Sequence, residues 1–106
     1  MRTVALIDGD SRRRNQVALA LTTVAGLSVS EFASTECYLH RVKQSLFSLV
    51  LIEASLLIEN NAEAITEPTL AFSCTMQMQN AAIPLLRLDM NLLPSFATEV
   101  QRFMSR

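Results

Sequence analysis

The chain contains no tryptophan and few other aromatic residues. Tyrosine occurs once and phenylalanine five times among 106 residues, although half of the sequence is hydrophobic. The interior must therefore be built mainly from leucine, isoleucine, valine, alanine and methionine. Glycine and proline are scarce, and no repeat, low-complexity tract or linker interrupts the sequence. This length predicts one domain that spans residues 1–106.

An excess of one charge is also missing, and so is a long apolar segment. Nine basic and ten acidic residues give a net charge of −1, so no basic surface for direct nucleic-acid contact is expected. The longest apolar run stops at Glu53, which is too short for a membrane span. Cys37 and Cys74 lack metal-site spacing and are expected to be free thiols. A strand pattern begins at once, without a signal peptide, and we expect a cytoplasmic protein.

Strand and helix patterns alternate along the chain. Short apolar runs predict buried strands, and apolar positions at helical spacing predict amphipathic helices. The expected strands are 3–8, 27–32, 47–52, 69–75 and 83–88. The expected helices are 11–25, about ten residues from Ser34 or Thr35, 55–65, 75–81 and a last one from Pro94 or Ser95. This order predicts an α/β fold with a single doubly wound parallel sheet, flavodoxin-like, with helices on both faces.

Acidic residues follow two of the expected strands. Asp8 and Asp10 come after the first strand, and Glu53 ends the strand at 47–52. If these strands are parallel neighbours, the carboxylates gather at the edge where such sheets bind ligands. Clustered carboxylates need a cation, which a metal or an arginine from 12–14 or at 87 would supply. The structural alternative is that Asp8 and Asp10 serve the turn after the first strand, with Asp10 or Ser11 as the cap of the next helix, and that Glu53 caps the helix after it. Gly9 can take positive φ where the first strand ends.

Three segments resemble the receiver domains of two-component response regulators. They are 4–10 (VALIDGD), 47–53 (FSLVLIE) and 83–89 (IPLLRLD). The separation of Asp8 from Glu53 is close to the family's separation of its first acidic position from its phospho-acceptor. The resemblance implies a receiver-like fold of four or five βα units with a shortened or atypical C-terminal part. We favour five strands, with 69–75 as the fourth; if 83–88 were the fourth, the last unit would be missing.

The sequence departs from the receiver pattern at each site that matters for phosphorylation. The family's paired acids, which hold Mg²⁺, correspond to Asp8 and Gly9, with Asp10 following, so Asp8 and Asp10 are weak metal candidates. Glu53 replaces the phospho-accepting aspartate. Ser73 or Thr75 matches the hydroxyl position, and Arg87 or Asp89 lies near the position of the family's lysine, since no lysine follows Lys43. We therefore expect no bound cofactor and no phosphorylation, with Thr75, Arg87 and Asp89 as candidate switch positions.

Two functions follow from these patterns. The first is a pseudo-receiver that acts in signal transduction as a non-enzymatic regulatory module. It would contact a protein partner or an attached output domain and form a homodimer, through the last helix and the segment 72–83. The second is a Mg²⁺-dependent nuclease, because 4–10 also resembles the opening of NYN/PIN-like nucleases, with Asp8, Asp10, Glu53 and Asp89 as metal ligands. A haloacid-dehalogenase-type phosphatase fits less well, since Arg12 stands where a small hydroxyl is expected.

Overall fold

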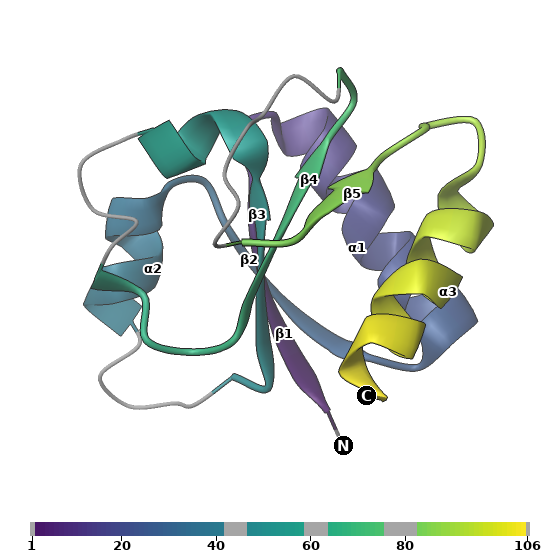
Figure 1. The fold of residues 1–106 in the computed structure, drawn as a ribbon, viewed down its shortest axis with the longest axis horizontal. Coiled ribbons are helices and arrows are strands. Elements are labelled where there is room, and N and C mark those ends of the chain that lie inside the picture. Colours follow the sequence, from purple (N-terminus) through teal and green to yellow (C-terminus); the bar gives the residue numbers. More distant parts are fainter. Residues whose placement is uncertain (1, 42–46, 59–63, 76–82, 106) are drawn as a thin grey trace.

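Five parallel strands form one sheet in the order β2-β1-β3-β4-β5 (Figure 1). The computed structural model describes residues 2–41, 47–58, 64–75 and 83–105. The strands are β1 (Thr3–Ile7), β2 (Ser28–Phe32), β3 (Leu49–Glu53), β4 (Thr69–Ser73) and β5 (Leu85–Arg87). The helices are α1 (Ser11–Ala25), α2 (Thr35–Arg41), the 3₁₀ helix η2 (Ala54–Ile58) and α3 (Leu93–Met104). The expected fold class and the assignment of 69–75 to the fourth strand are confirmed.

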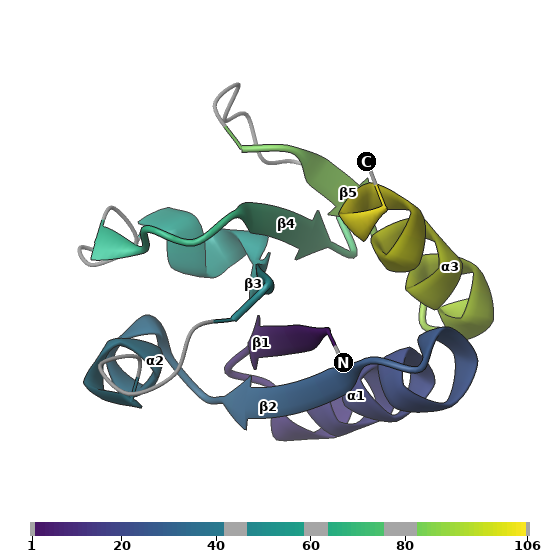
Figure 2. The same cartoon turned by 90° about the horizontal axis from the view of Figure 1, so that it is seen from below.

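Helices cover both faces of the sheet. Figures 1 and 2 show α1 and α3 side by side on one face, while α2 lies on the other. Gln101 of α3 donates a hydrogen bond to the carbonyl of Ala25 at the end of α1, with an Nε2–O distance of 3.5 Å. None of the helices in the described part of the chain is long and apolar enough to span a membrane. Cys37 and Cys74 are both free and exposed, as expected.

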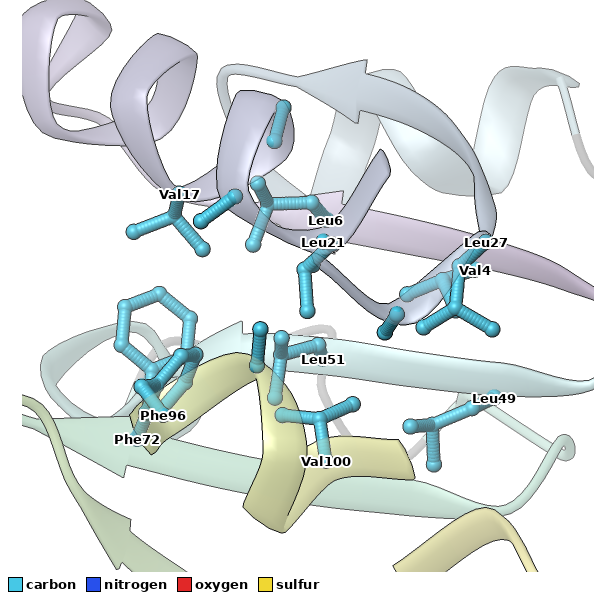
Figure 3. Close-up of a cluster of buried hydrophobic side chains, with 14 of the residues drawn as sticks. Val4, Leu6, Val17, Leu21, Leu27, Leu49, Leu51, Phe72, Phe96 and Val100 are labelled. Atoms are coloured by element: carbon cyan, nitrogen blue, oxygen red, sulfur yellow. The ribbon is translucent and has the colours of Figure 1, made fainter. Parts of the chain in front are cut away.

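The larger core lies between the sheet and the pair α1 and α3 (Figure 3). Alternate residues of the central strands point into it, and the intervening residues point to the opposite face, so both faces of these strands are apolar. Phe72 of β4 is fully buried and meets Phe96 of α3 edge to face, with ring centroids 5.8 Å apart. The main buried members are Val4, Leu6, Val17, Leu21, Leu49, Leu51, Leu70, Phe72, Phe96 and Val100.

An aromatic cluster anchors the opposite face. Tyr38 of α2 is fully buried and packs edge to face on Phe32 of β2, with ring centroids 5.4 Å apart. Phe47 joins both rings, at 6.0 Å from Phe32 and 5.9 Å from Tyr38. The Tyr38 hydroxyl donates a 2.6 Å hydrogen bond to Oε1 of Glu67, which precedes β4. This bond joins α2 to a segment 29 residues further along the chain.

The ionisation of Tyr38 is expected to report this packing. Burial, and then the hydrogen bond to Glu67, raises its pKa well above the usual value of 10.0. Because the folded state holds the neutral phenol, this stabilisation is complete below pH about 10 and is lost as the pH rises through the folded-state pKa. Phenolate absorbance measures it cleanly, because the chain has no other tyrosine and no tryptophan. Titration near the ordinary value in the folded protein would contradict the prediction, and Tyr38→Phe is the control.

Local chemistry explains where the helices begin and end. Gly26 ends α1 in the left-handed region, with φ of 67°. Gly9 was predicted to be able to take positive φ after β1, but it does not use this freedom: Asp10 closes the turn by donating its N–H to Asp8. The helix predicted at 55–65 is instead the 3₁₀ turn Ala54–Ile58, and asparagines, which are poor helix formers, follow it in the sequence. Residues 59–63 and most of the helix predicted at 75–81 lie outside the described residues.

Candidate functional site

The carboxyl ends of β1 and β3 place Asp8 and Glu53 at one edge of the sheet. Ile7 pairs with Ile52 in the parallel register, and each acidic residue directly follows one of these partners. The Asp8 N–H donates to the carbonyl of Phe32 in β2, at 3.1 Å, so the ladder continues through Asp8. Asp8 is fully buried, whereas Glu53 is half-buried. The two carboxylates therefore sit at the same edge at different depths.

Arg13 neutralises Asp8 with a bidentate ion pair. Its Nε lies 2.6 Å from Oδ2 and its Nη2 lies 2.6 Å from Oδ1 of Asp8. The Arg13 side chain is only 25% exposed, and that of Asp8 is fully buried. The hydrogen bonds to Asp8 raise the pKa of Arg13 and outweigh the opposing effect of its partial burial. The guanidinium is thus the positive centre of this edge.

Arg14 forms further hydrogen bonds at this edge but does not contact the Asp8 carboxylate. Its Nη1 donates to the main-chain oxygen of Asp8 at 2.7 Å, and its Nε pairs with Oε1 of Glu31 on β2 at 3.1 Å. Cations at a helix N-terminus are unfavourable unless acidic groups compensate them. Arg13 and Arg14 both find such groups, which explains why α1 tolerates basic residues in its first turn.

Asp10 is the N-cap of α1. Its Oδ1 accepts the N–H of Arg13 at 3.0 Å. This backbone hydrogen bond, together with the charges of Arg13 and Arg12, lowers the pKa of Asp10 below its usual value. The side chain is exposed. The capping role foreseen as the structural alternative is therefore present.

The Glu53 side chain bonds to Ser55, two residues after the end of β3. Its Oε2 accepts the Ser55 N–H at 2.9 Å, and its Oε1 accepts the Ser55 hydroxyl. Both oxygens are thus engaged at the start of η2, as expected for a carboxylate that caps the next turn. Its charge still reaches Arg13.

The candidate switch positions lie at or just after the carboxyl ends of β4 and β5. Buried Ser73 ends β4, and its Oγ lies 3.0 Å from Oγ1 of exposed Thr75, whose N–H donates to the same Oγ at 3.1 Å. Arg87 pairs with Ser73 in the register of β4 and β5 and is exposed. Asp89 accepts the N–H of Asn91 on Oδ1 at 2.9 Å and so stabilises the turn before α3. The hydroxyl pair and Arg87 share the sheet edge with Asp8, while Asp89 serves a turn.

Solved structures resemble this chain although its sequence matches no protein-family model and no curated protein. The chemotaxis response regulator CheY4 of Vibrio cholerae gives a TM-score of 0.74 at 17% identity, over 98% of each chain. A response regulator receiver protein from Burkholderia phymatum gives 0.76 at 14% identity, over 99% of this chain and 96% of that one. The chain has the receiver fold. Full-length FixJ from B. japonicum gives 0.66 at 17% identity, and this chain covers 59% of it.

These likenesses bear on the two families that residues 4–10 resemble. The Vibrio cholerae and Burkholderia phymatum proteins are a response regulator and a response regulator receiver protein, and the nuclease alternative is not supported. The receiver fold also accounts for the strand order, with the acidic edge at the carboxyl ends of β1 and β3.

The receiver fold implies a Mg²⁺ ion at the acidic edge, and the residues here do not fit one. Mg²⁺ requires near-octahedral coordination by oxygen. Both oxygens of Asp8 bind Arg13, Asp10 caps α1, and both oxygens of Glu53 bind Ser55. Within the described ranges, no group of three or more histidine, cysteine or acidic residues could hold a metal.

The partner of Asp8 was not singled out from the sequence. Arg12, Arg13, Arg14 and Arg87 were all candidates for neutralising the acidic edge, and nothing identified Arg13 as the partner of Asp8. The arginine choice depends on the rotation of α1, which the N-cap at Asp10 sets.

Proposed function

We propose that this receiver-fold chain is a regulatory protein-contact module that works without phosphorylation and without enzymatic activity of its own. The observation that carries the proposal is the side-chain arrangement at the acceptor position. Glu53 stands at the end of β3, and both of its oxygens bind Ser55. In-line phosphoryl transfer depends on exact placement of the attacking oxygen, and a glutamate is one methylene longer than an aspartate.

The surroundings of Glu53 support the same proposal. Arg87, not a lysine, lies on β5, and it is exposed beside the register partner Ser73. A ligand shifts a conformational equilibrium only through contacts that differ between the two states. With Asp8 held by Arg13 and Glu53 held by Ser55, a phosphoryl group would have to break existing bonds before making new ones.

A surface on the last helix supports a role in protein contact. An open hollow of about 310 Å³ lies between the end of β5 and the start of α3. Leu92 stands at its rim with 55% of the residue exposed. We propose a second copy of the chain as the occupant, which gives a cytosolic homodimer. The other residues around the hollow are Arg87, Asp89, Ser95, Phe96 and Glu99.

A small-molecule phosphodonor with Mg²⁺ is expected to leave the mass of the intact protein unchanged. The reason is that no aspartate stands at the acceptor position and Arg13 occupies the Asp8 carboxylate. Intact-protein mass spectrometry gives the answer directly, with a phosphorylatable receiver treated in parallel as the positive control.

The variant Glu53→Asp separates the two causes. It supplies the acceptor type of the family but keeps Arg13, so we expect its mass to stay unchanged as well. Addition of a phosphoryl group to the native chain would refute the proposed function. Addition of a phosphoryl group to Glu53→Asp alone would mean that the side-chain length of residue 53 is the whole reason why the native chain is not phosphorylated.

A further inference from the structure

We propose that Arg13 is the resident cation of this pocket and excludes divalent metal ions from it. The inference rests on the proposed function, because it explains how the acidic edge is held in a single charge state. It predicts a gain of metal binding: a chain without the guanidinium should bind a divalent cation that the native chain does not bind.

The first argument is the occupancy of Asp8. A divalent ion needs at least one lone pair directed at it from the carboxylate. Oδ2 accepts Nε of Arg13, and Oδ1 accepts both Nη2 of Arg13 and the N–H of Asp10, at 2.6, 2.6 and 3.0 Å respectively. Because Asp8 is fully buried, water does not compete for these oxygens. A metal would have to break the bidentate pair to reach them.

The second argument is that Arg13 is held in place through both its main chain and its side chain. The N–H of Arg13 donates to the N-cap Asp10, at 3.0 Å, while its side chain binds Asp8. Residues 8 to 13 thus form a closed loop of side-chain contacts around the start of α1. A displaced guanidinium would stay beside the incoming ion as a like charge, which raises the cost of metal entry.

The third argument is that the remaining acids are available once Arg13 is removed. Glu53 directly follows Ile52, the register partner of Ile7, so it leaves the sheet at the same edge as Asp8. Its contacts are with the neighbouring Ser55 alone among the described hydrogen bonds, and these are local and half-exposed. Asp8 and Glu53 would then offer oxygen ligands to a hard cation such as Mn²⁺.

Arg14 provides a matched control. It also belongs to the first turn of α1, but it binds the main-chain oxygen of Asp8 and the Glu31 carboxylate, leaving the Asp8 carboxylate untouched. Arg14→Met therefore removes the same charge from the same turn without freeing an oxygen of the Asp8 carboxylate. Arg13→Met keeps a long apolar stem and removes only the guanidinium.

The test is a Mn²⁺ titration of the whole chain, followed by the electron paramagnetic resonance signal of the free ion. We expect the native chain and Arg14→Met to show no saturable binding, and Arg13→Met to bind one ion per chain in the millimolar range. Adding Asp8→Asn to Arg13→Met should abolish this binding. Saturable binding by the native chain that Asp8→Asn removes would overturn the inference, and so would a folded Arg13→Met that binds no ion.

If Arg13→Met alone does not fold, circular dichroism replaces the binding signal. Mn²⁺ at millimolar concentration should then restore the helical spectrum, because the ion takes over the role of the guanidinium. Failure to restore it would overturn the inference. These outcomes are separate from the phosphodonor test: a native chain that binds Mn²⁺ but gains no phosphoryl group would refute the resident cation and leave the proposed function standing.

Discussion

Replacing Arg13 with methionine is expected to lower the free energy of unfolding by about 3 kcal/mol in metal-free buffer. Removing one partner of a buried ion pair costs on the order of 3–5 kcal/mol, because the other charge is left uncompensated. Asp8 is fully buried, while Arg13 is 25% exposed, and this places the effect toward the lower end. Urea denaturation followed by circular dichroism, with a chelator present, measures the change.

A double-mutant cycle separates the ion pair from general damage to the site. Asp8→Asn removes the charge that Arg13 compensates but leaves a group of the same size. If the cost of Arg13→Met comes from the stranded carboxylate, the double variant should be more stable than Arg13→Met alone. Purely additive effects in the cycle would mean that Arg13 stabilises the fold through its packing and not through Asp8.

Replacing Phe72 with alanine is expected to destabilise the fold by about 3–5 kcal/mol, the usual cost of deleting a buried aromatic ring. Phe72 is fully buried at the centre of the larger core, and its ring meets Phe96 edge to face. The substitution removes the ring contacts by which β4 packs on α3. Thermal and urea unfolding of the variant give the magnitude.

Leu19→Ala is the matched control for this prediction. Leu19 lies on α1 and is 64% exposed, so its truncation should change the stability by less than about 0.5 kcal/mol. A similar loss in both variants would contradict the view that the interface between the sheet and α3 carries the stability. A small loss in Phe72→Ala would mean that the core collapses into the space left by the ring.

The strands were the most predictable part of this fold. Residues 4–7 and 49–52 are apolar at every position because β1 and β3 bury both faces, and such runs have few alternatives. Parallel pairing then fixes the edge at which Asp8 and Glu53 emerge. Asp10 was one of two residues predicted to cap α1, with Ser11 as the other, because a cap depends on a contact only three residues long.

The contacts that the sequence did not predict depend on side-chain direction or on distant segments. Neighbouring residues of a helix point about 100° apart, so the selection of Arg13 over Arg12 follows from the exact start of α1. The bond from Tyr38 to Glu67 spans 29 residues and has no local signature. An α-helix was predicted at 55–65, whereas the chain begins a 3₁₀ helix at Ala54, and Glu53 caps it by accepting the N–H of Ser55.

A counter-ion that belongs to the polypeptide cannot be diluted or removed by a chelator. The bidentate pair of Asp8 and Arg13 is present as soon as α1 docks on the sheet, whatever the ionic composition around it. The charge state of this pocket is then fixed when the chain folds, and it does not change with each signal. Under the proposed function, the regulatory strength of such a module would be set by its copy number and by the abundance of its binding partners.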